Sequence, residues 1–145
     1  MQWSKDVNAG FSAAPAEALA APVIEQGPYG ATRINVADQS SDPESLLAWM
    51  KGLIRLRRQC PEWGAGSCTV LDIDEPGVFG HRTEWQGSTL LALHNLANKP
   101  CSVRVRQERE QRSVPLWGNG RCQAGREFAT VELEPYGYAW YRVVA

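Results

Sequence analysis

Hydrophobic and polar positions follow two different periods along this chain of 145 residues. Between Asp42 and Cys60 apolar residues recur every three to four positions, which predicts an amphipathic α-helix, the only strong helix pattern in the sequence. Asp42 is the expected cap of the first turn, and Pro43 suits the first helical position. Pro61 is expected to end the helix.

One half of this expected helix is apolar, and a single arginine interrupts it. The apolar positions are Leu46, Leu47, Trp49, Met50, Leu53, Ile54 and Leu56. Arg57 falls in the middle of that half. Because a buried guanidinium without partners is costly, we expect Arg57 to bind a carboxylate or several carbonyl oxygens, as a structural residue. The alternative is that its stem lies across the apolar surface while its head reaches water.

After Gly64 and Gly66 the period changes to two, which is typical of strands. Turn residues separate the alternating segments, which are Thr69–Ile73, Val78–Trp85, Thr89–Leu96, Ser102–Arg106, Val114–Trp117, Phe128–Leu133 and Tyr138–Val144. The segment Thr89–Leu96 is apolar on both faces and should be a central strand. Ser102–Arg106 should have one wet face and lie at an edge. The pattern predicts a mainly β fold, a small antiparallel β-sandwich preceded by a long loop segment and one amphipathic helix.

Residues 1–41 read as loop, since glycine and proline are frequent and the apolar residues follow no period. A structureless segment of this length is uncommon in a compact domain unless it is functional or a linker. It is too apolar for a linker, because it contains Trp3, Phe11, Ile24, Tyr29 and Ile34. We therefore expect a long loop that lies on a surface outside this chain. The expected domain organisation is residues 1–63, then a β-sandwich domain over residues 64–145.

Composition excludes several classes of function. The net charge is -1 and the pI is about 6.1. The sequence has no run of Lys or Arg, so it does not indicate a basic surface for nucleic-acid binding. No apolar run reaches the roughly 18 residues of a membrane span, and the N-terminus lacks the apolar core of a signal peptide. The four cysteines have irregular spacing and no CxxC, so we expect free thiols, no metal site and no cofactor, in a cytoplasmic protein.

Nucleophilic catalysis has little support in the sequence. Cys101 with His94, or Cys68 with His81, could form a thiol–imidazole pair. Nothing in the spacing favours either pair, and packed strand residues are the expected outcome.

Several motifs resemble the α-amylase superfamily of glycoside hydrolases. The opening MQWSKDVNAGFS resembles the MQW…NAGFS segment that follows the eighth strand of the superfamily's catalytic (β/α)₈ barrel. The continuation, with PVI, YG, INVADQ, DPESLLAWM and CPEWGAG in order, resembles trehalose synthase more than amylases or oligo-1,6-glucosidases. The end, ELEPYGYAWYRV, resembles the last strands of domain C, the β-domain after the barrel. The resemblance covers essentially the whole chain.

The resemblance implies that residues 1–63 correspond to the end of the catalytic barrel and residues 64–145 to an α-amylase domain C-like sandwich. The family's catalytic carboxylates lie on barrel strands upstream of this segment, so no catalytic residue is assigned here. The loop after the eighth strand borders the active-site mouth. Trp3, Asn8 and Phe11 are therefore candidate substrate-binding residues.

Three functions are consistent with these observations. The favoured one is the C-terminal fragment of a trehalose synthase-like enzyme, structural and catalytically inactive on its own. The parent activity would be interconversion of maltose and trehalose through a covalent glucosyl intermediate. In the second, the chain represents that parent enzyme. In the third, it is an independent carbohydrate-binding or protein-interaction module. Expected partners are a barrel domain, or a second copy bound through residues 1–60, and an α-glucan or disaccharide, but no nucleic acid and no membrane.

Overall fold

The computed structural model describes residues 2–106 and 111–144. These residues belong to two compact units, Met1–Arg55 and Leu56–Ala145. The division falls within helix α2 (Leu46–Gln59). The expected domain boundary between residues 63 and 64 stays a prediction. None of the described helices has the length and apolar character needed to cross a membrane.

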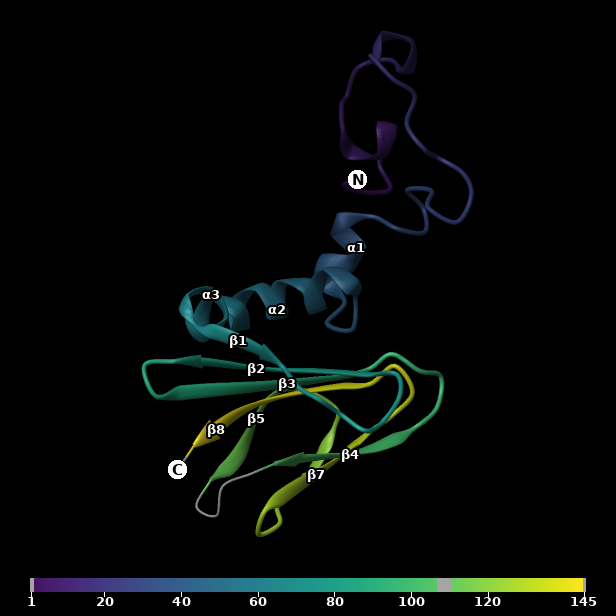
Figure 1. Ribbon diagram of the computed structural model, residues 1–145. Helices are drawn as coiled ribbons and strands as arrows, with labels where there is room; N and C mark the ends of the chain where they lie inside the picture. Colours follow the sequence, from purple (N-terminus) through teal and green to yellow (C-terminus); the bar gives the residue numbers. More distant parts are fainter. Residues whose placement is uncertain (1, 107–110, 145) are drawn as a thin grey trace. The chain divides into compact units, whose positions relative to one another are not determined.

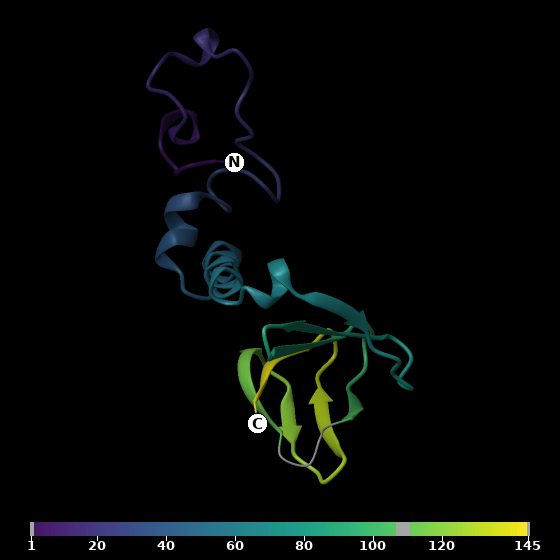
Figure 2. The ribbon, with the colours of Figure 1, turned by 60° about the vertical axis from the view of Figure 1, so that its left-hand side comes forward.

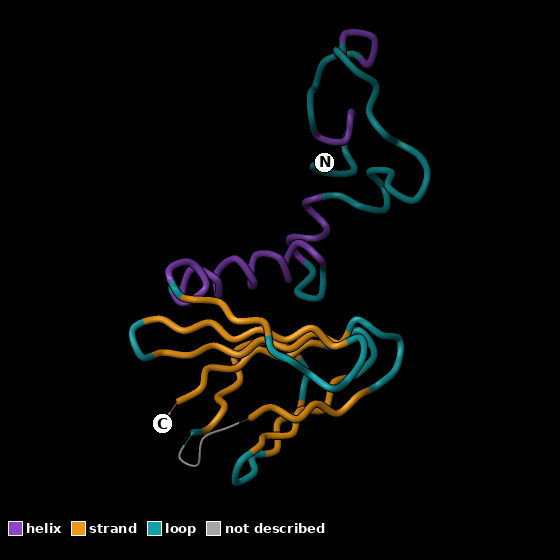
Figure 3. The backbone as a smooth tube through the Cα atoms, in the orientation of Figure 1, coloured by secondary structure: helices purple, strands orange, loops and turns teal. Residues whose placement is uncertain are grey.

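The first unit is mostly loop, as Figure 3 shows. It contains two 3₁₀ turns, η1 (Val7–Gly10) and η2 (Ala16–Ala18), and the short helix α1 (Val36–Ser41). The Asn35 side chain caps α1, because its Oδ1 accepts a hydrogen bond of 2.8 Å from the Asp38 backbone N–H. Our sequence interpretation missed α1, which is too short to show a helical period.

The amphipathic helix is confirmed, but its expected start at Asp42 is wrong. Helix α2 begins at Leu46, and the Ser45 hydroxyl accepts the Ala48 backbone N–H at 3.1 Å. Asp42 instead ends α1 and accepts the Glu44 N–H in a turn. Both Asp42 and Ser45 have a side-chain oxygen that can accept a free N–H group of the first helical turn. Ser45, which directly precedes α2, is the one that does so.

The second unit contains a short helix and two antiparallel sheets, seen from two sides in Figures 1 and 2. The five-stranded sheet has the order β1-β2-β3-β8-β5 and the three-stranded sheet the order β4-β7-β6. The elements are α3 (Glu62–Ala65), β1 (Ser67–Val70), β2 (Val78–Trp85), β3 (Ser88–Asn95), β4 (Cys101–Arg106), β5 (Arg112–Gly118), β6 (Arg121–Gln123), β7 (Phe128–Leu133) and β8 (Tyr138–Val144). The predicted mainly β sandwich is confirmed.

The core of this unit lies between the two sheets, where alternate residues of each strand meet. Its buried members are Leu91, Leu93, Val103, Val131, Leu133, Ala139 and Tyr141. The Tyr141 hydroxyl donates to the Gly120 carbonyl oxygen at 3.0 Å, and burial raises the pKa of Tyr141 to about 12. Each phenol that enters a core needs such a partner, because an unpaired buried hydroxyl is costly.

Strand positions follow the sequence pattern closely. Strand β3 is central, between β2 and β8, and β4 lies at the edge of its sheet, where exposed residues alternate with Val103 and Val105, as expected. The first strand is displaced, because β1 runs from Ser67 to Val70. Our interpretation missed α3 and β6, which are too short for periodicity to show.

Candidate functional site

Backbone hydrogen bonds close the N-terminal loop on α1. The Trp3 N–H donates to the Ala9 carbonyl oxygen at 2.9 Å, and the Trp3 carbonyl accepts the Ala37 N–H at 2.9 Å. The Gln2 carbonyl accepts the Val36 N–H at 3.0 Å. These carbonyls satisfy N–H groups of the first turn of α1 that no helical bond can reach. The MQW, NAG and INVADQ motifs therefore meet in one place.

A left-handed turn shapes this loop. Asn8, Ala9 and Gly10 have φ angles of 52°, 54° and 74°, a conformation that costs free energy for residues other than glycine. The buried Asn8 amide compensates, since its Nδ2 donates to the Ser12 carbonyl at 2.9 Å and the Ala14 carbonyl at 2.7 Å. Such turns persist where the surroundings fix them, and they gather at ligand-binding sites.

The three candidate substrate-binding residues differ in what they offer. Trp3 and Phe11 are 54% and 50% exposed, so their aromatic faces are available to a ligand. Asn8 is buried, and both N–H bonds of its amide are used within the loop. This geometry favours a loop-shaping role for Asn8. Contact with a substrate stays a prediction for all three residues.

A hollow of about 800 Å³ lies within the first unit. Its lining includes several alanines and the polar residues Lys5, Asp6, Asn8, Glu25 and Thr32. At its border Lys5 Nζ lies 2.8 Å from Asp38 Oδ2, and the hydrogen bond from Lys5 lowers the pKa of the Asp38 carboxyl. Its volume is in the range of small-molecule sites, which are roughly 300–1,000 Å³.

A second polar cluster joins Glu62, the first residue of α3, to Ser88 and Arg142 of the five-stranded sheet. Glu62 is 2% exposed, and its Oε1 lies 3.2 Å from Arg142 Nη2 and accepts the Ser88 hydroxyl at 2.6 Å. Arg142 Nη2 also donates to the Cys60 sulfur at 3.5 Å. Burial acts to raise the pKa of Glu62, but these hydrogen bonds and the positive charge outweigh it, so the pKa is lowered. Burial raises the pKa of the Cys60 thiol.

Two histidines lie side by side on the same face of the five-stranded sheet. The rings of His81 and His94 are nearly parallel, with centroids 6.3 Å apart, and the Trp140 Nε1–H donates to His94 Nε2 at 3.2 Å. Burial lowers the pKa of both imidazoles. No hydrogen bond joins Cys68 or Cys101 to a histidine in the described part of the chain. The thiol–imidazole pairs are therefore not formed. His81, His94 and Cys101 are partly buried strand residues, whereas Cys68 is exposed.

Arg57 is exposed, which corrects the expectation of a buried guanidinium paired with a carboxylate or several carbonyl oxygens and favours the alternative in which the head reaches water. Its Nη2 donates to the Trp63 carbonyl at 3.0 Å, the one hydrogen bond found for this side chain within residues 2–106 and 111–144. Helix α2 ends two residues later, so the side chain reaches the first turn of α3 rather than a core. The contact still gives Arg57 a structural role.

The cysteines and acidic groups form no metal centre in the described residues. Cys60, Cys68, Cys101 and Cys122 are all free. Residues 2–106 and 111–144 contain no group of three or more His, Cys, Asp or Glu side chains that could hold a metal ion.

Comparison with known proteins shows what the chain is similar to. Residues 87–142 match the family "Sucrose hydrolase-like, C-terminal domain". The trehalose synthase of Thermus thermophilus is 32% identical over 148 residues, which cover 97% of this chain and 15% of the relative. That of Pimelobacter sp. (strain R48) is 32% identical over 154 residues, which cover 99% of this chain and 26% of the relative.

A solved structure shows the same fold. Trehalulose synthase MutB from Pseudomonas mesoacidophila MX-45 superposes with a TM-score of 0.71 at 25% identity, over 99% of this chain and 24% of that chain. A MutB mutant in complex with its substrate sucrose gives a TM-score of 0.72 over the same shares.

The chain is therefore similar to the C-terminal region of trehalose synthases, and it shares its fold with trehalulose synthase MutB. It spans 15% to 26% of the length of these curated relatives. The predicted resemblance to the C-terminal part of trehalose synthases is confirmed.

Proposed function

We propose that these residues form the structural C-terminal part of an α-glucosyl enzyme whose activity is the interconversion of maltose and trehalose. The observation that supports this proposal best is the 32% identity to trehalose synthases over 97% to 99% of the chain. On this proposal the sandwich and α3 support a barrel that carries the catalytic carboxylates, and this chain alone has no turnover. A retaining glycosidase needs two carboxyl groups about 5–5.5 Å apart across the glycosidic bond.

The N-terminal loop would contribute to the sugar site of that enzyme. Trp3 and Phe11 are exposed on a loop fixed by hydrogen bonds to α1 and by the Asn8 amide. Aromatic faces suit the C–H groups of a sugar ring. An α-glucan or disaccharide is the proposed ligand.

The alternative function is an independent carbohydrate-binding or protein-interaction module. The exposed aromatic residues and the hollow of about 800 Å³ favour it. Titration with maltose and with trehalose distinguishes the two functions. A module binds sugar saturably in the isolated chain and loses binding in Trp3→Ala and Phe11→Ala. Ile24→Ala, at an exposed aliphatic residue that does not line the hollow, is the matched control. The structural proposal predicts no saturable binding by the isolated chain.

The DNA upstream of the Met1 codon tests the favoured function directly. We expect it to encode an α-amylase-type barrel with its paired carboxylates. Upstream DNA that encodes no such barrel would contradict the proposal. We also propose a cytoplasmic location, which cell fractionation tests.

A further inference from the structure

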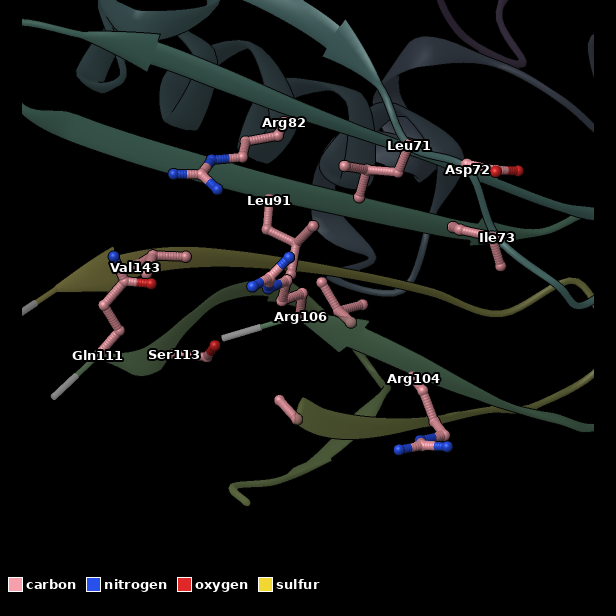
Figure 4. A pocket seen from close by; sticks show the side chains of 12 residues that line it. Leu71, Asp72, Ile73, Arg82, Leu91, Arg104, Arg106, Gln111, Ser113 and Val143 are labelled. Carbon is pink, nitrogen blue, oxygen red and sulfur yellow. The ribbon is translucent and has the colours of Figure 1, made fainter. Parts of the chain in front are cut away.

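A cavity of about 160 Å³ opens between the two sheets of the sandwich (Figure 4). Its inner wall is apolar and consists of Leu71, Ile73, Leu91, Val105, Ala129 and Val143. Leu91 and Ala129 are buried, and Ala129 contributes only a methyl group to this wall. Gln111 and Ser113 also line the cavity, so its apolar wall adjoins polar side chains.

Arginines border this cavity. Figure 4 shows the Arg106 guanidinium pointing toward Leu91, whereas Arg104 points away from the cavity. Arg104 instead lies over the Phe128 ring, with Cζ 4.5 Å from the ring centroid. Arg82 also lines the cavity, and Glu84 Oε1 lies 2.6 Å from its Nε.

The charge of Arg106 is not neutralised within the described residues. No carboxylate of residues 2–106 or 111–144 lies within ion-pair distance of it. Asp72 also lines the cavity, but it lies at the far end from Arg82 in Figure 4. A cation beside an apolar cavity favours a ligand that has both an anionic group and an apolar body.

The volume limits the size of that body. An apolar cavity of about 150 Å³ holds a benzene ring, and a guanidinium matches a carboxylate through two parallel hydrogen bonds. We propose that this cavity binds an aryl carboxylate of the size of benzoate. The ring contacts Leu91, Val105 and Val143, and the carboxylate binds Arg106. This site is separate from the N-terminal loop and does not depend on the function proposed above.

Titration of the full chain with sodium benzoate at constant ionic strength tests the proposal, followed by methyl chemical shifts. We expect saturable shifts of the Leu91, Val105 and Val143 methyl groups, with a Kd on the order of 1 mM. Arg106→Gln should weaken binding about tenfold, the effect of losing one charge-assisted hydrogen-bonding partner. Arg121→Gln, at an exposed arginine of strand β6 that does not line the cavity, is the matched control and should leave binding unchanged.

Two further probes separate the contributions of charge and ring. Benzyl alcohol, which keeps the ring without the carboxylate, should bind about tenfold more weakly, and inorganic phosphate should not shift the methyl groups. Ala129→Leu, which fills the cavity, should abolish the benzoate shifts. If that variant does not fold, the comparison of Arg106→Gln with Arg121→Gln decides. Absence of saturable shifts at about tenfold above the expected Kd, or equal binding by Arg106→Gln and wild type, would overturn the proposal.

Discussion

Arg142 Nη2 lies 3.2 Å from Glu62 Oε1, although Glu62 is almost wholly buried. The two residues come from the last strand and from the helix before the first strand. Trp63, next to Glu62, packs edge-on against Trp140 with ring centroids 5.0 Å apart. The ion pair and the ring contact together fix α3 on the five-stranded sheet.

Loss of the Glu62 carboxylate should destabilise the second unit. Glu62→Ala leaves the partly buried Arg142 guanidinium and the Ser88 hydroxyl without their acceptor, and breaking a buried pair costs about 3–5 kcal/mol. Arg142 retains some contact with water, so we expect about 3 kcal/mol in chemical unfolding followed by near-UV circular dichroism. Glu84→Ala, which breaks an exposed pair with Arg82, should cost less than about 1 kcal/mol. Equal losses in the two variants would show that the Glu62 pair is not a stabilising contact.

The His81–His94 pair should make stability fall in mild acid. Burial lowers the pKa of His94 in the folded chain, and the neighbouring His81 lowers it further, so the unfolded chain binds more protons. The free energy of unfolding should then decrease as the pH falls from about 7 to about 5. Protonation of Nε2 also removes the acceptor of the Trp140 N–H.

The variant that tests this pH effect is His94→Gln, which keeps a hydrogen-bond acceptor but does not titrate. Its free energy of unfolding should depend less steeply on pH over the same interval, with the remaining slope due to His81. A slope equal to that of the wild type would mean that His94 does not contribute.

Arg57→Met should change stability little. The guanidinium is exposed and makes one hydrogen bond to the Trp63 carbonyl, and a single such bond contributes about 0.5–1.5 kcal/mol. We expect a loss of about 1 kcal/mol or less in thermal or chemical unfolding. A loss several times larger would indicate the buried, partnered arginine that its place on the helix suggested.

The strands were largely predictable, because each buries one face and alternation records this directly. Val78–Trp85, Phe128–Leu133 and Tyr138–Val144 have the predicted bounds. Single hydrogen bonds, which periodicity does not reveal, determine where the helices begin. Ser45 rather than Asp42 precedes α2, although the Asn35-x-x-Asp38 spacing, a polar cap three residues before an acidic residue, could have revealed α1.

The polar clusters were less predictable than the strands. Glu62 and Arg142 are distant in sequence, and only the paired strands bring them together. His81 and His94 lie on neighbouring strands. Their rings are adjacent only because of the register between β2 and β3, which depends on the turn that joins the strands. The N-terminal loop was located by its motifs, whereas the buried position of Asn8 depended on the left-handed turn at residues 8–10.

Association should depend on the apolar residues of α2 and the N-terminal loop. Leu46, Met50 and Ile54 follow one another at intervals of one turn and are all exposed, a pattern that monomers avoid. In the absence of a barrel domain we expect a homodimer through residues 1–60. Light scattering at high micromolar concentration measures this. A strict monomer in which residues 1–41 resist proteolysis would contradict the expectation.

The most direct test of the central claim is turnover of maltose by the purified chain, with glucose and trehalose as the measured products. Our account assigns these residues a supporting role in a maltose- and trehalose-converting enzyme, so it predicts that neither product forms above the rate without protein. Product formation that survives repurification and follows the protein peak would contradict it.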